Sequence, residues 1–326
     1  MTQPSPQSFT AQAPIASPFG LRSTAAEVIE GIDLAGKTAV VTGGYSGLGT
    51  ETVRALASAG ARVIVAARRP DAAASDLDGI AGVTILALDL SDPASIDAFA
   101  EKLAGETDAV DILINNAAIM ANPLTRDPRG YESQFATNHL GHFQMVARIW
   151  PLLAARGARV ISVSSVGHQR NGLSVEDPSF EHREYEKWNA YGQAKSANAL
   201  FALELDKRGA AYGVRAFSVH PGGIVTPLQR HLTMEEQTKM GWFNAEGNVN
   251  PRFKSVEAGA ATSVWAATSP LLAGMGGVYC EDCNVAAMAG PDTPRGVGAM
   301  PHIRDEALAA ALWTKSEEMT GVTFRP

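Results

Sequence analysis

Cysteine is scarce in this sequence, with only Cys280 and Cys283 among 326 residues. So few thiols exclude a disulfide-stabilised scaffold and are typical of a reducing compartment, so we expect a cytoplasmic protein. The two cysteines form one C-x-x-C pair, but a tetrahedral zinc needs two more ligands, and no second pair or nearby histidine pair supplies them. A redox dithiol stays open, although the pair follows a predicted strand instead of beginning a helix. We therefore predict two packed thiols and no metal site.

Long apolar runs and an excess of basic residues are also absent. No run reaches the roughly 18 apolar residues that a membrane-spanning helix requires. The chain has 27 Lys and Arg against 34 Asp and Glu, a formal net charge of -7. This balance excludes the basic footprint typical of proteins that bind nucleic acid or an anionic membrane surface. We expect a small-molecule ligand and no nucleic-acid or membrane partner.

Charged residues are missing from the first 21 positions, where four prolines stand among Gln, Ser and Thr. With no basic n-region and no long apolar h-region, this stretch does not have the pattern of a secretory signal. We expect residues 1–22 to form a flexible N-terminal arm and residues 23–326 to form a single domain. Thr24 and Glu27 have the spacing of a capping box, which predicts a short helix before the first strand.

Glycine is concentrated between positions 43 and 49, where four glycines separate an apolar run of strand length from a segment of helical periodicity. A helix that begins at such a turn directs unpaired N–H groups and the positive end of its dipole toward a ligand, and glycines let a pyrophosphate approach closely. The implied ligand is a dinucleotide. The spacing T-G-x-x-x-G-x-G differs from the G-x-G-x-x-G fingerprint, so an ordinary tight turn stays the alternative for this window alone.

The end of the second predicted strand favours NADP(H) over NAD(H). Enzymes that bind NAD place an acidic side chain there for the ribose 2′-hydroxyl, whereas an arginine accommodates the 2′-phosphate of NADP. Here Arg68 and Arg69 follow the strand, and no carboxylate occurs before Asp71. We predict that Arg68 binds the 2′-phosphate. The alternative is that both arginines are only solvated surface charges.

Strand and helix patterns alternate along the chain after the glycine turn. Such alternation predicts an α/β protein, a single doubly wound Rossmann domain with a mostly parallel, seven-stranded sheet and helices on both faces. Ligands of such sheets bind at the carboxyl ends of the strands, so the functional loops should follow each strand. The expected strands cover 39–41, 63–65, 83–88, 112–114, 160–163 and 214–219, with a late strand near 276–279, and the expected helices include 93–103, 131–153 and 190–205.

Tyr191 and Lys195 stand four residues apart on the predicted helix 190–205, which places them on one face. Lowering the pKa of a tyrosine from about 10 to roughly 7 or 8 requires about 3 to 4 kcal/mol. One ammonium about 4 Å away supplies on the order of 4 kcal/mol at an effective dielectric constant near 20. We therefore predict that Lys195 lowers the pKa of Tyr191 and that Tyr191 acts as a general acid and base. The pair alone is common by chance and could be structural.

Six motifs together resemble the short-chain dehydrogenase/reductase family over about residues 34–283. They are T-G-G-Y-S-G-L-G at 42–49, N-N-A-A at 115–118, T-N-H-L-G-H-F around Asn138, V-S-S at 163–165, Y-G-Q-A-K at 191–195 and H-P-G-G-I-V-T at 220–226. The stretches 19–37 and 191–205 look most like the branch of the retinol dehydrogenases and the WW-domain oxidoreductase. The resemblance implies a nicotinamide cofactor, carbonyl and alcohol chemistry, and possible homo-oligomers.

The resemblance also implies a role for each of four catalytic residues. Tyr191 would exchange a proton with the substrate oxygen, and Lys195 would lower its pKa and hold the nicotinamide ribose. Ser165 would hydrogen-bond the carbonyl or alkoxide oxygen. Asn138 would position Lys195 through a chain of water molecules.

Cofactor contacts follow from the same resemblance. Asp89 and Leu90 would flank the adenine, Asn116 and Ala117 would line the cofactor path, and Thr226 would anchor the carboxamide. The full set of expected cofactor-binding residues is Gly43, Tyr45, Ser46, Gly47, Leu48, Gly49, Arg68, Asp89, Leu90, Asn116, Ala117, Tyr191, Lys195, Pro221, Gly222, Ile224 and Thr226.

Three segments depart from the commonest pattern of the family or fall outside its motifs. The insert 167–189 between Ser165 and Tyr191 is polar, and we expect a loop over the site. Ser164 rivals Ser165 for the serine role, although neighbours on a strand point to opposite faces. Residues 228–254 contain methionines and aromatic residues, which suits a mobile substrate lid or, alternatively, an amphipathic segment that covers the core. Residues 284–326 form a C-terminal extension whose predicted helix 303–319 could close the pocket rim.

Histidines offer no clear metal site. His139 and His142 lie one turn apart on a predicted helix, but no third ligand stands at a fixed spacing. His168 and His182 fall in the insert and could contact substrate.

The leading hypothesis is an NADP(H)-dependent oxidoreductase that interconverts a ketone or aldehyde and an alcohol on a fairly apolar small molecule. A non-catalytic NADPH-sensing module and a carbon–carbon double-bond reductase are the alternatives.

Overall fold

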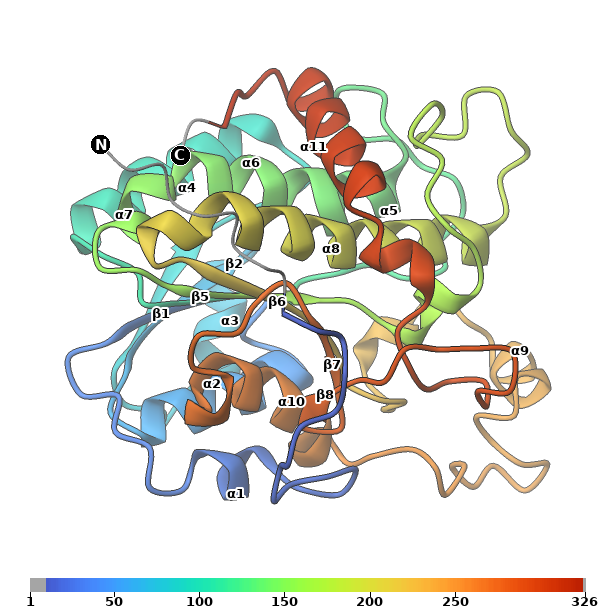
Figure 1. The fold of residues 1–326 in the computed structure, drawn as a ribbon, viewed down its shortest axis with the longest axis horizontal. Helices are drawn as coiled ribbons and strands as arrows, with labels where there is room; N and C mark the ends of the chain where they lie inside the picture. Colours follow the sequence, from blue (N-terminus) through green and yellow to red (C-terminus); the bar gives the residue numbers. More distant parts are fainter. Residues whose placement is uncertain (1–9, 325–326) are drawn as a thin grey trace.

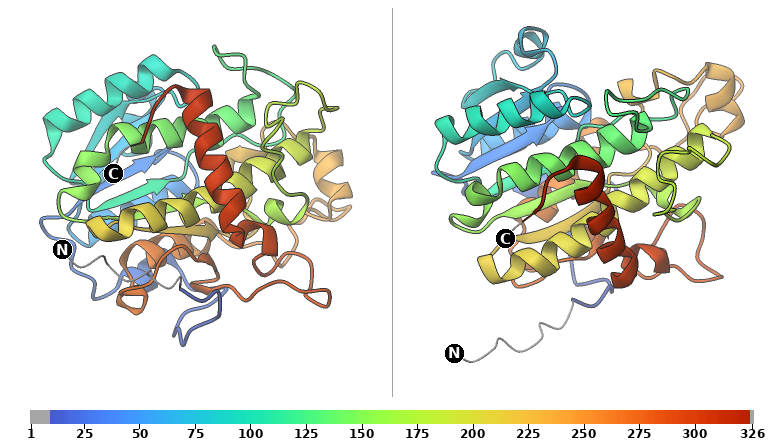
Figure 2. Two further views of the ribbon diagram at one scale, coloured as in Figure 1. Left: turned by 45° about the horizontal axis from the view of Figure 1, so that its top comes forward. Right: turned by 90° about the horizontal axis from the view of Figure 1, so that it is seen from above.

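The computed structural model describes residues 10–324 as three layers, in which a twisted sheet lies between two sets of helices (Figures 1 and 2). The sheet has the strand order β3-β2-β1-β4-β5-β6-β7-β8, and β8 alone is antiparallel to its neighbour. The strands are β1 (Thr38–Thr42), β2 (Arg62–Ala67), β3 (Val83–Ala87), β4 (Ile112–Asn115), β5 (Arg159–Val163), β6 (Arg215–His220), β7 (Tyr279–Glu281) and β8 (Asn284–Val285). The expected doubly wound, mostly parallel sheet is confirmed, with β8 as an eighth strand.

Apolar and β-branched residues in the central strands explain why the sheet is buried on both faces. Val40 of β1 pairs with Ile64 of β2 on one side and with Leu113 of β4 on the other. Chain order reverses at β1, because β2 and β3 lie to one side of it and β4 to β8 lie to the other. Such a reversal opens a crevice at the carboxyl ends of β1 and β4, where open α/β sheets bind their ligands.

Helices on the two faces bury separate apolar clusters against the sheet. One face carries α1 (Ala25–Ile29), α2 (Leu48–Ser58), α3 (Pro70–Asp76) and α10 (Val256–Thr268). The other carries α4 (Pro93–Glu106), α6 (Gly141–Arg148), α7 (Trp150–Ala154) and α8 (Lys187–Gly209) (Figure 1). The short helix α1 has the expected capping box between Thr24 and Glu27.

The helix expected over 131–153 is broken into four pieces. The pieces are α5 (Ser133–Phe135), a π-helical turn (Ala136–Leu140), α6 and α7. Pro151 stands in the first turn of α7 and cannot donate the hydrogen bond that would continue α6. At the start of α6, a Cβ on Gly141 would lie 2.2 Å from the carbonyl oxygen of Leu90, so this helix approaches the loop after β3 closely. The apolar periodicity of the sequence does not indicate where a helix is interrupted.

Helix α8 is longer than the expected 190–205, because the carboxylate of Glu186 accepts hydrogen bonds from the amides of Trp188 and Asn189 and so begins the helix earlier. Helix α11 (Glu306–Thr320) replaces the expected helix 303–319 and packs on α8, where Trp313 stacks on Phe201 with centroids 5.8 Å apart. It covers α8 and does not line the pocket described below, so the expectation that it closes the pocket rim is wrong.

Where a flexible arm was expected, the part of it that the structure describes is bound to the β7–β8 hairpin. The side chain of Gln12 bonds the backbone of Tyr279 and Ala286, and the amide side chain of Asn284 bonds both backbone groups of Ile15. Residues 1–9 lie outside the described residues. Between residues 10 and 324, no helix is long and apolar enough to cross a membrane.

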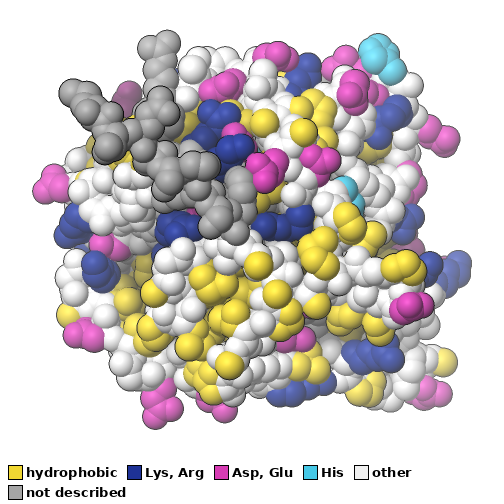
Figure 3. Space-filling view, viewed as in Figure 1, with side chains coloured by type: hydrophobic (Ala, Val, Ile, Leu, Met, Phe, Trp, Pro, Cys, Tyr) yellow, Lys and Arg dark blue, Asp and Glu magenta, His cyan; other side chains and the backbone are white. Residues whose placement is uncertain are grey.

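Lys, Arg, Asp and Glu side chains are interspersed on the face of the molecule that Figure 3 shows.

The two cysteines are buried near the end of the sheet and are not bonded to each other. Burial is the main reason why the pKa of Cys283 rises to about 11, and it raises the pKa of Cys280 further. Both therefore stay protonated at neutral pH, unlike reactive thiolates.

Candidate active site

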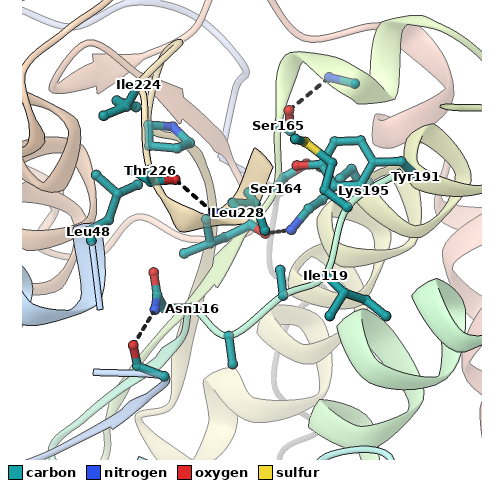
Figure 4. A pocket seen from close by; sticks show the side chains of 18 of the residues that line it. Leu48, Asn116, Ile119, Ser164, Ser165, Tyr191, Lys195, Ile224, Thr226 and Leu228 are labelled. Carbon is teal, nitrogen blue, oxygen red and sulfur yellow. Dashed lines mark hydrogen bonds between the residues drawn. The ribbon is translucent and has the colours of Figure 1, made fainter. Parts of the chain in front are cut away.

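A cavity of about 1280 Å³ opens at the carboxyl ends of the parallel strands (Figure 4). Ser165, Tyr191 and Lys195 gather on one side of it, and Leu48, Ile224 and Thr226 lie on another. The expected cofactor residues that line it are Gly43, Tyr45, Ser46, Gly47, Leu48, Arg68, Asp89, Leu90, Asn116, Ala117, Tyr191, Lys195, Pro221, Gly222, Ile224 and Thr226. Two expected site residues, Gly49 and Asn138, do not line the cavity and lie behind its wall.

The glycine turn shapes the floor of the cavity. Gly43 and Gly47 have φ angles of 63° and 54°, which other residues rarely adopt. A Cβ on Gly49 would lie 2.2 Å from the carbonyl oxygen of Gly43, so only glycine lets the turn close. Gly47 precedes α2 without a side-chain cap, so the start of α2 can present backbone amides to an anion, although the amide of Gly49 already donates to the oxygen of Ser46. The turn therefore fits the pyrophosphate of a dinucleotide.

Arg68 and Arg69 lie at the end of β2 and both line the cavity. Both side chains are exposed, and neither forms an ion pair with a carboxylate among residues 10–324. Asp71 lies one turn further on, in α3, and does not line the cavity. Two unpaired guanidinium groups thus stand where the 2′ position of an adenosine ribose is expected.

Thr42 connects the end of β1 to the loop after β4. Its hydroxyl oxygen accepts hydrogen bonds from the amides of Asn116 and Ala117, at 2.9 and 3.0 Å. The Asn116 side chain returns a bond from Nδ2 to the backbone oxygen of Thr42, at 2.9 Å. These bonds hold two adjacent strand ends together at the crevice, so the cofactor path has a rigid wall.

An ion pair between a buried lysine and a partly exposed aspartate supports the loop after β6, and no pattern in the sequence pointed to it. The Lys254 side chain is 1% exposed, and its Nζ lies 2.6 Å from Oδ1 of Asp282. Its stem packs against Gly222, where a Cβ would lie 2.7 Å from Cε of Lys254, and the φ of Gly222 is 103°. The amide of Lys254 also donates to the oxygen of Gly223. Lys254 therefore fixes the backbone of the expected carboxamide-binding loop.

Ser165 and Tyr191 meet inside the cavity. The Ser165 hydroxyl accepts a hydrogen bond from the amide of Gly167, and the Tyr191 ring packs so closely on Gly167 that a Cβ there would lie 3.1 Å from two ring carbons. Ser164 is buried, and its hydroxyl donates to the backbone oxygen of Lys195 at 2.7 Å. The hydroxyl of Ser164 is thus engaged in α8, so Ser165 is the serine that faces the tyrosine.

The pKa of Tyr191 is raised, contrary to the expectation that Lys195 lowers it. Burial raises the pKa of Tyr191 to about 12, against a smaller opposite effect of the Ser165 hydrogen bond. Burial also lowers the pKa of Lys195 to about 7. The ammonium lies 5.6 Å from the centre of the Tyr191 ring and donates to the backbone oxygen of Val163 at 2.9 Å. At neutral pH Tyr191 is a protonated phenol, because desolvation outweighs the hydrogen bond of Ser165.

Asn138 lies in the π-helical turn and is 1% exposed. Its side chain forms two hydrogen bonds with the backbone of Ile119, with Oδ1 accepting from the amide and Nδ2 donating to the oxygen, both at 2.9 Å. The side chain therefore has no contact with Lys195. Any link from Asn138 toward the lysine has to use its backbone carbonyl.

An aromatic and apolar wall stands beside Tyr191. Trp188 lies edge-on to Tyr191 and to Trp242, with ring centroids 6.3 and 6.0 Å apart, and Trp242 contacts Phe253 at 5.9 Å. Trp242 and Phe253 belong to the expected lid 228–254, which also contains α9 (Met234–Lys239). Sequence reasoning missed Trp188 and Phe253.

Met234 and Met240, which were expected to suit an adaptable pocket, are exposed and do not line the cavity. The segment 228–254 contacts α8 through an ion pair between Lys187 and Glu236. The segment 228–254 thus has two exposed methionines outside the cavity, and the residues that it contributes to the lining are Leu228, Gln229, Arg230, Trp242, Arg252, Phe253 and Lys254.

Only the two ends of the insert reach the cavity, through Gly167, Arg170 and Trp188. Its middle packs on the segment 126–134, where Arg126 donates to the backbone of Ser179 and Phe180. The expected loop over the site is therefore supplied only by the two ends of the insert.

The two histidines of the insert do not line the cavity. His168 is buried, with Nδ1 2.7 Å from the oxygen of Ser165 and Nε2 accepting from the amide of Met300. His182 is exposed and lies at a separate small hollow. Neither histidine is therefore placed to contact a substrate beside Tyr191.

The arrangement combines a glycine turn at a helix N-terminus, a crevice at the point where strand order reverses, and a buried tyrosine with a serine beside it. The first two features suit a dinucleotide, and the third offers a proton donor and a hydroxyl that can hydrogen-bond a substrate oxygen. This fold and site define a dinucleotide-dependent oxidoreductase.

Comparison with known proteins identifies the family. Residues 37–237 match the family model described as short chain dehydrogenase, and the chain belongs to the short-chain dehydrogenase/reductase family. A protein named "Probable oxidoreductase" from Streptomyces antibioticus is 46% identical over 294 residues, which cover 86% of this chain and 97% of that protein. Retinol dehydrogenase 12 of Homo sapiens is 36% identical over 300 residues, 90% of this chain and 89% of that one.

A crystal structure of an uncharacterised protein from Mycobacterium Paratuberculosis has the same fold, with a TM-score of 0.71 and 33% identity. The match covers 94% of this chain and 100% of that one. These findings confirm the resemblance to the family and to its retinol dehydrogenase branch, and they confirm that the protein is an oxidoreductase of this family.

Proposed function

We propose that this protein is an NADP(H)-dependent reductase that interconverts a ketone or aldehyde and an alcohol on a fairly apolar small molecule. The observation that carries the proposal is the position of the buried phenol of Tyr191, which lies between Ser165 and the aromatic wall inside the dinucleotide cavity. A bound reduced nicotinamide would supply a hydride to the substrate carbon. Every other step falls to the residues described above.

Proton transfer is the task of Tyr191. A phenol with a pKa near 12 is protonated at neutral pH, so it can donate its proton to the oxygen of a carbonyl that gains a hydride. The Ser165 hydroxyl stands beside it and would hydrogen-bond the same oxygen as negative charge develops. A protonated Tyr191 is thus in the form that reduction of a carbonyl requires.

The apolar character of the substrate follows from the wall of Trp188, Trp242 and Phe253. These side chains offer ring faces and edges beside Tyr191, and burial of apolar surface against them supplies binding free energy at about 25 cal/mol per Å². Leu228 and Met120 extend this surface within the cavity. A substrate with a sizeable apolar body next to its carbonyl matches this surface.

Activity with carbonyl substrates tests the proposal directly. A panel of apolar ketones and aldehydes is followed at the nicotinamide absorbance with NADPH and with NADH. Tyr191→Phe should lower kcat by about 100-fold or more, because it removes the proton donor, and should leave the NADPH dissociation constant nearly unchanged. Unchanged turnover in this variant would reject the mechanism. Product analysis separates an alcohol from the product of double-bond reduction, and NADPH binding without turnover on any substrate would favour the sensing module.

Cofactor preference is tested by Arg68→Gln, with Arg69→Gln as the matched variant at the adjacent position. A guanidinium paired with a phosphate is worth about 1.5–3 kcal/mol, so loss of the correct arginine should raise KM for NADPH by about 10- to 100-fold and change KM for NADH little. Equal losses with both cofactors would contradict the assignment of Arg68 to the 2′-phosphate. A larger effect of Arg69→Gln would transfer the role to Arg69.

A further inference from the structure

A chain of buried hydrogen bonds joins the cofactor side of the cavity to Asn138, and it runs through His142. His142 stands at the start of α6 and is 3% exposed. Its Nε2 lies 2.9 Å from the hydroxyl oxygen of Thr42, and its Nδ1 lies 3.0 Å from the backbone oxygen of Asn138. The mechanism above does not use this imidazole, and among the described residues it belongs to no group of three or more side chains that could hold a metal ion.

The hydrogen bonds at Thr42 determine which nitrogen of His142 carries the proton. The hydroxyl oxygen of Thr42 already accepts from two backbone amides, those of Asn116 and Ala117. An amide can only donate, and a hydroxyl oxygen has two lone pairs, so both are used. The hydroxyl hydrogen is then free to point at Nε2, which has to be unprotonated. The alternative acceptor for this hydrogen, the oxygen of Ile114, is further away at 3.4 Å.

The other ring nitrogen must therefore carry the hydrogen and donate it to the carbonyl of Asn138. A charged imidazolium would direct a third donor at the Thr42 oxygen, which has no lone pair left. Consistent with this geometry, burial lowers the pKa of His142 to about 4, and the charged group that faces it is Lys195. His139, one turn earlier, is the other titratable group close to it.

We propose that His142 is a positioning residue, which as a neutral Nδ1–H tautomer links the carbonyl of Asn138 to Thr42 and so to the cofactor-binding loop after β4. The Asn138 side chain is fully engaged by Ile119, so the backbone carbonyl is the group that can serve the lysine side of the site. A carbonyl oxygen has two lone pairs, and His142 occupies one of them. His142 thus leaves one lone pair of this carbonyl oxygen to accept a hydrogen bond from another group.

This inference rests on the proposed function for its kinetic part only. Loss of the imidazole would leave the carbonyl of Asn138 and the hydroxyl of Thr42 without their shared partner. The two elements that they belong to, the π-helical turn and the end of β1, could then shift relative to each other. Because reacting groups tolerate little displacement, we expect lower kcat with less effect on cofactor binding.

The tautomer is tested in the wild-type protein by NMR of ¹⁵N-labelled histidine side chains, without reference to activity. The expected result is a neutral ring with a protonated Nδ1 and an unprotonated Nε2 down to about pH 5. His142→Asn identifies the signal by its disappearance. A protonated Nε2, or an imidazolium at pH 6, would overturn the proposal. This measurement remains decisive if variants at position 142 fail to fold.

The positioning role is tested with His142→Phe and with His139→Phe as the matched control. Like His142, His139 is buried and does not line the cavity, and it packs against aromatic rings, but its Nε2 bonds Ser316 of α11 at 2.7 Å. We expect His142→Phe to lower kcat for carbonyl reduction by about 10- to 100-fold with NADPH affinity changed less than about threefold. We expect His139→Phe to keep kcat within about twofold even where it lowers stability.

The conservative variant His142→Asn places an amide N–H near the position of Nδ1 and should recover part of the kcat that phenylalanine loses. Equal kcat losses in His142→Phe and His139→Phe, or no loss in the first, would overturn the positioning role. If the wild-type protein reduces no carbonyl compound, the proposed function fails, and the tautomer measurement still supports or rejects the hydrogen-bond chain. The two failures are therefore distinguishable.

Discussion

Replacing Lys195 by methionine should make the cofactor-free protein more stable at neutral pH. Burial lowers the pKa of Lys195 to about 7 from its ordinary value of 10.5. Each pKa unit corresponds to about 1.4 kcal/mol, so the folded state carries a penalty of about 4 kcal/mol at pH 7 for a group that prefers to be charged. Methionine removes the penalty and gives up one hydrogen bond to Val163, which is worth about 1 kcal/mol. That carbonyl keeps a bond from Asn198, so it is not left without a partner.

The pH dependence distinguishes this explanation from a general packing effect. Between the folded pKa near 7 and the unfolded value of 10.5, the unfolded chain binds more protons, so the stability of the wild-type protein rises with pH in this window. Below pH 7 both states bind the proton and the penalty is constant. The advantage of Lys195→Met should therefore be about 3 kcal/mol at pH 7 and should disappear toward pH 10.

Urea denaturation of the wild-type protein and the variant at both pH values is the assay. Lys207→Met supplies the control, because Lys207 lies on the same helix with about half of its side chain exposed. A stability difference of Lys195→Met that is the same at pH 7 and pH 10, or a variant that is less stable at pH 7, would refute the reasoning. Loss of carbonyl reduction in the stabilised variant would show that stability is given up here for function.

Two further substitutions probe the two halves of the cavity. Gly49→Ala places a methyl group 2.2 Å from the oxygen of Gly43, so it should weaken NADPH binding at least about tenfold in a fluorescence titration, and unchanged affinity would contradict the described turn. Trp242→Ala removes a ring of the apolar wall, so it should raise KM for a bulky apolar ketone about tenfold and leave NADPH affinity unchanged, because a buried aromatic side chain contributes about 1.5–3 kcal/mol. An equal rise in KM for a small polar ketone would argue against the wall.

Much of the fold was accessible from the sequence because strand runs and glycine turns are local signals. The β-branched run at 63–65 is read directly as β2, and the glycines at 43–49 determine how β1 passes into α2. The break in the helix 131–153 was not accessible in the same way. At the start of α6, Gly141 closely approaches Leu90, a contact between segments 51 residues apart that periodicity does not contain, whereas Pro151 at the break before α7 is a local signal.

The chemistry of the site was only partly predictable from the sequence, because it also depends on burial and on contacts between distant residues. The spacing of Tyr191 and Lys195 correctly placed both side chains at one cavity, but it carried no information on burial. Burial turns out to dominate, raising the pKa of the phenol and lowering that of the lysine. Lys254 and His142 were missed as functional groups, because their partners Asp282 and Thr42 are 28 and 100 residues away in the chain.

The docked segment ahead of α1 has a practical consequence for protein engineering. Strand β8 is the last strand of the sheet and has only two residues, and the side chain of Asn284 binds the backbone of Ile15 at that border. An uncovered border of this kind is a template on which another polypeptide can add a strand and start aggregation. Shortened versions of the protein should therefore retain the stretch from Thr10 onward if they are to stay monodisperse in concentrated solution.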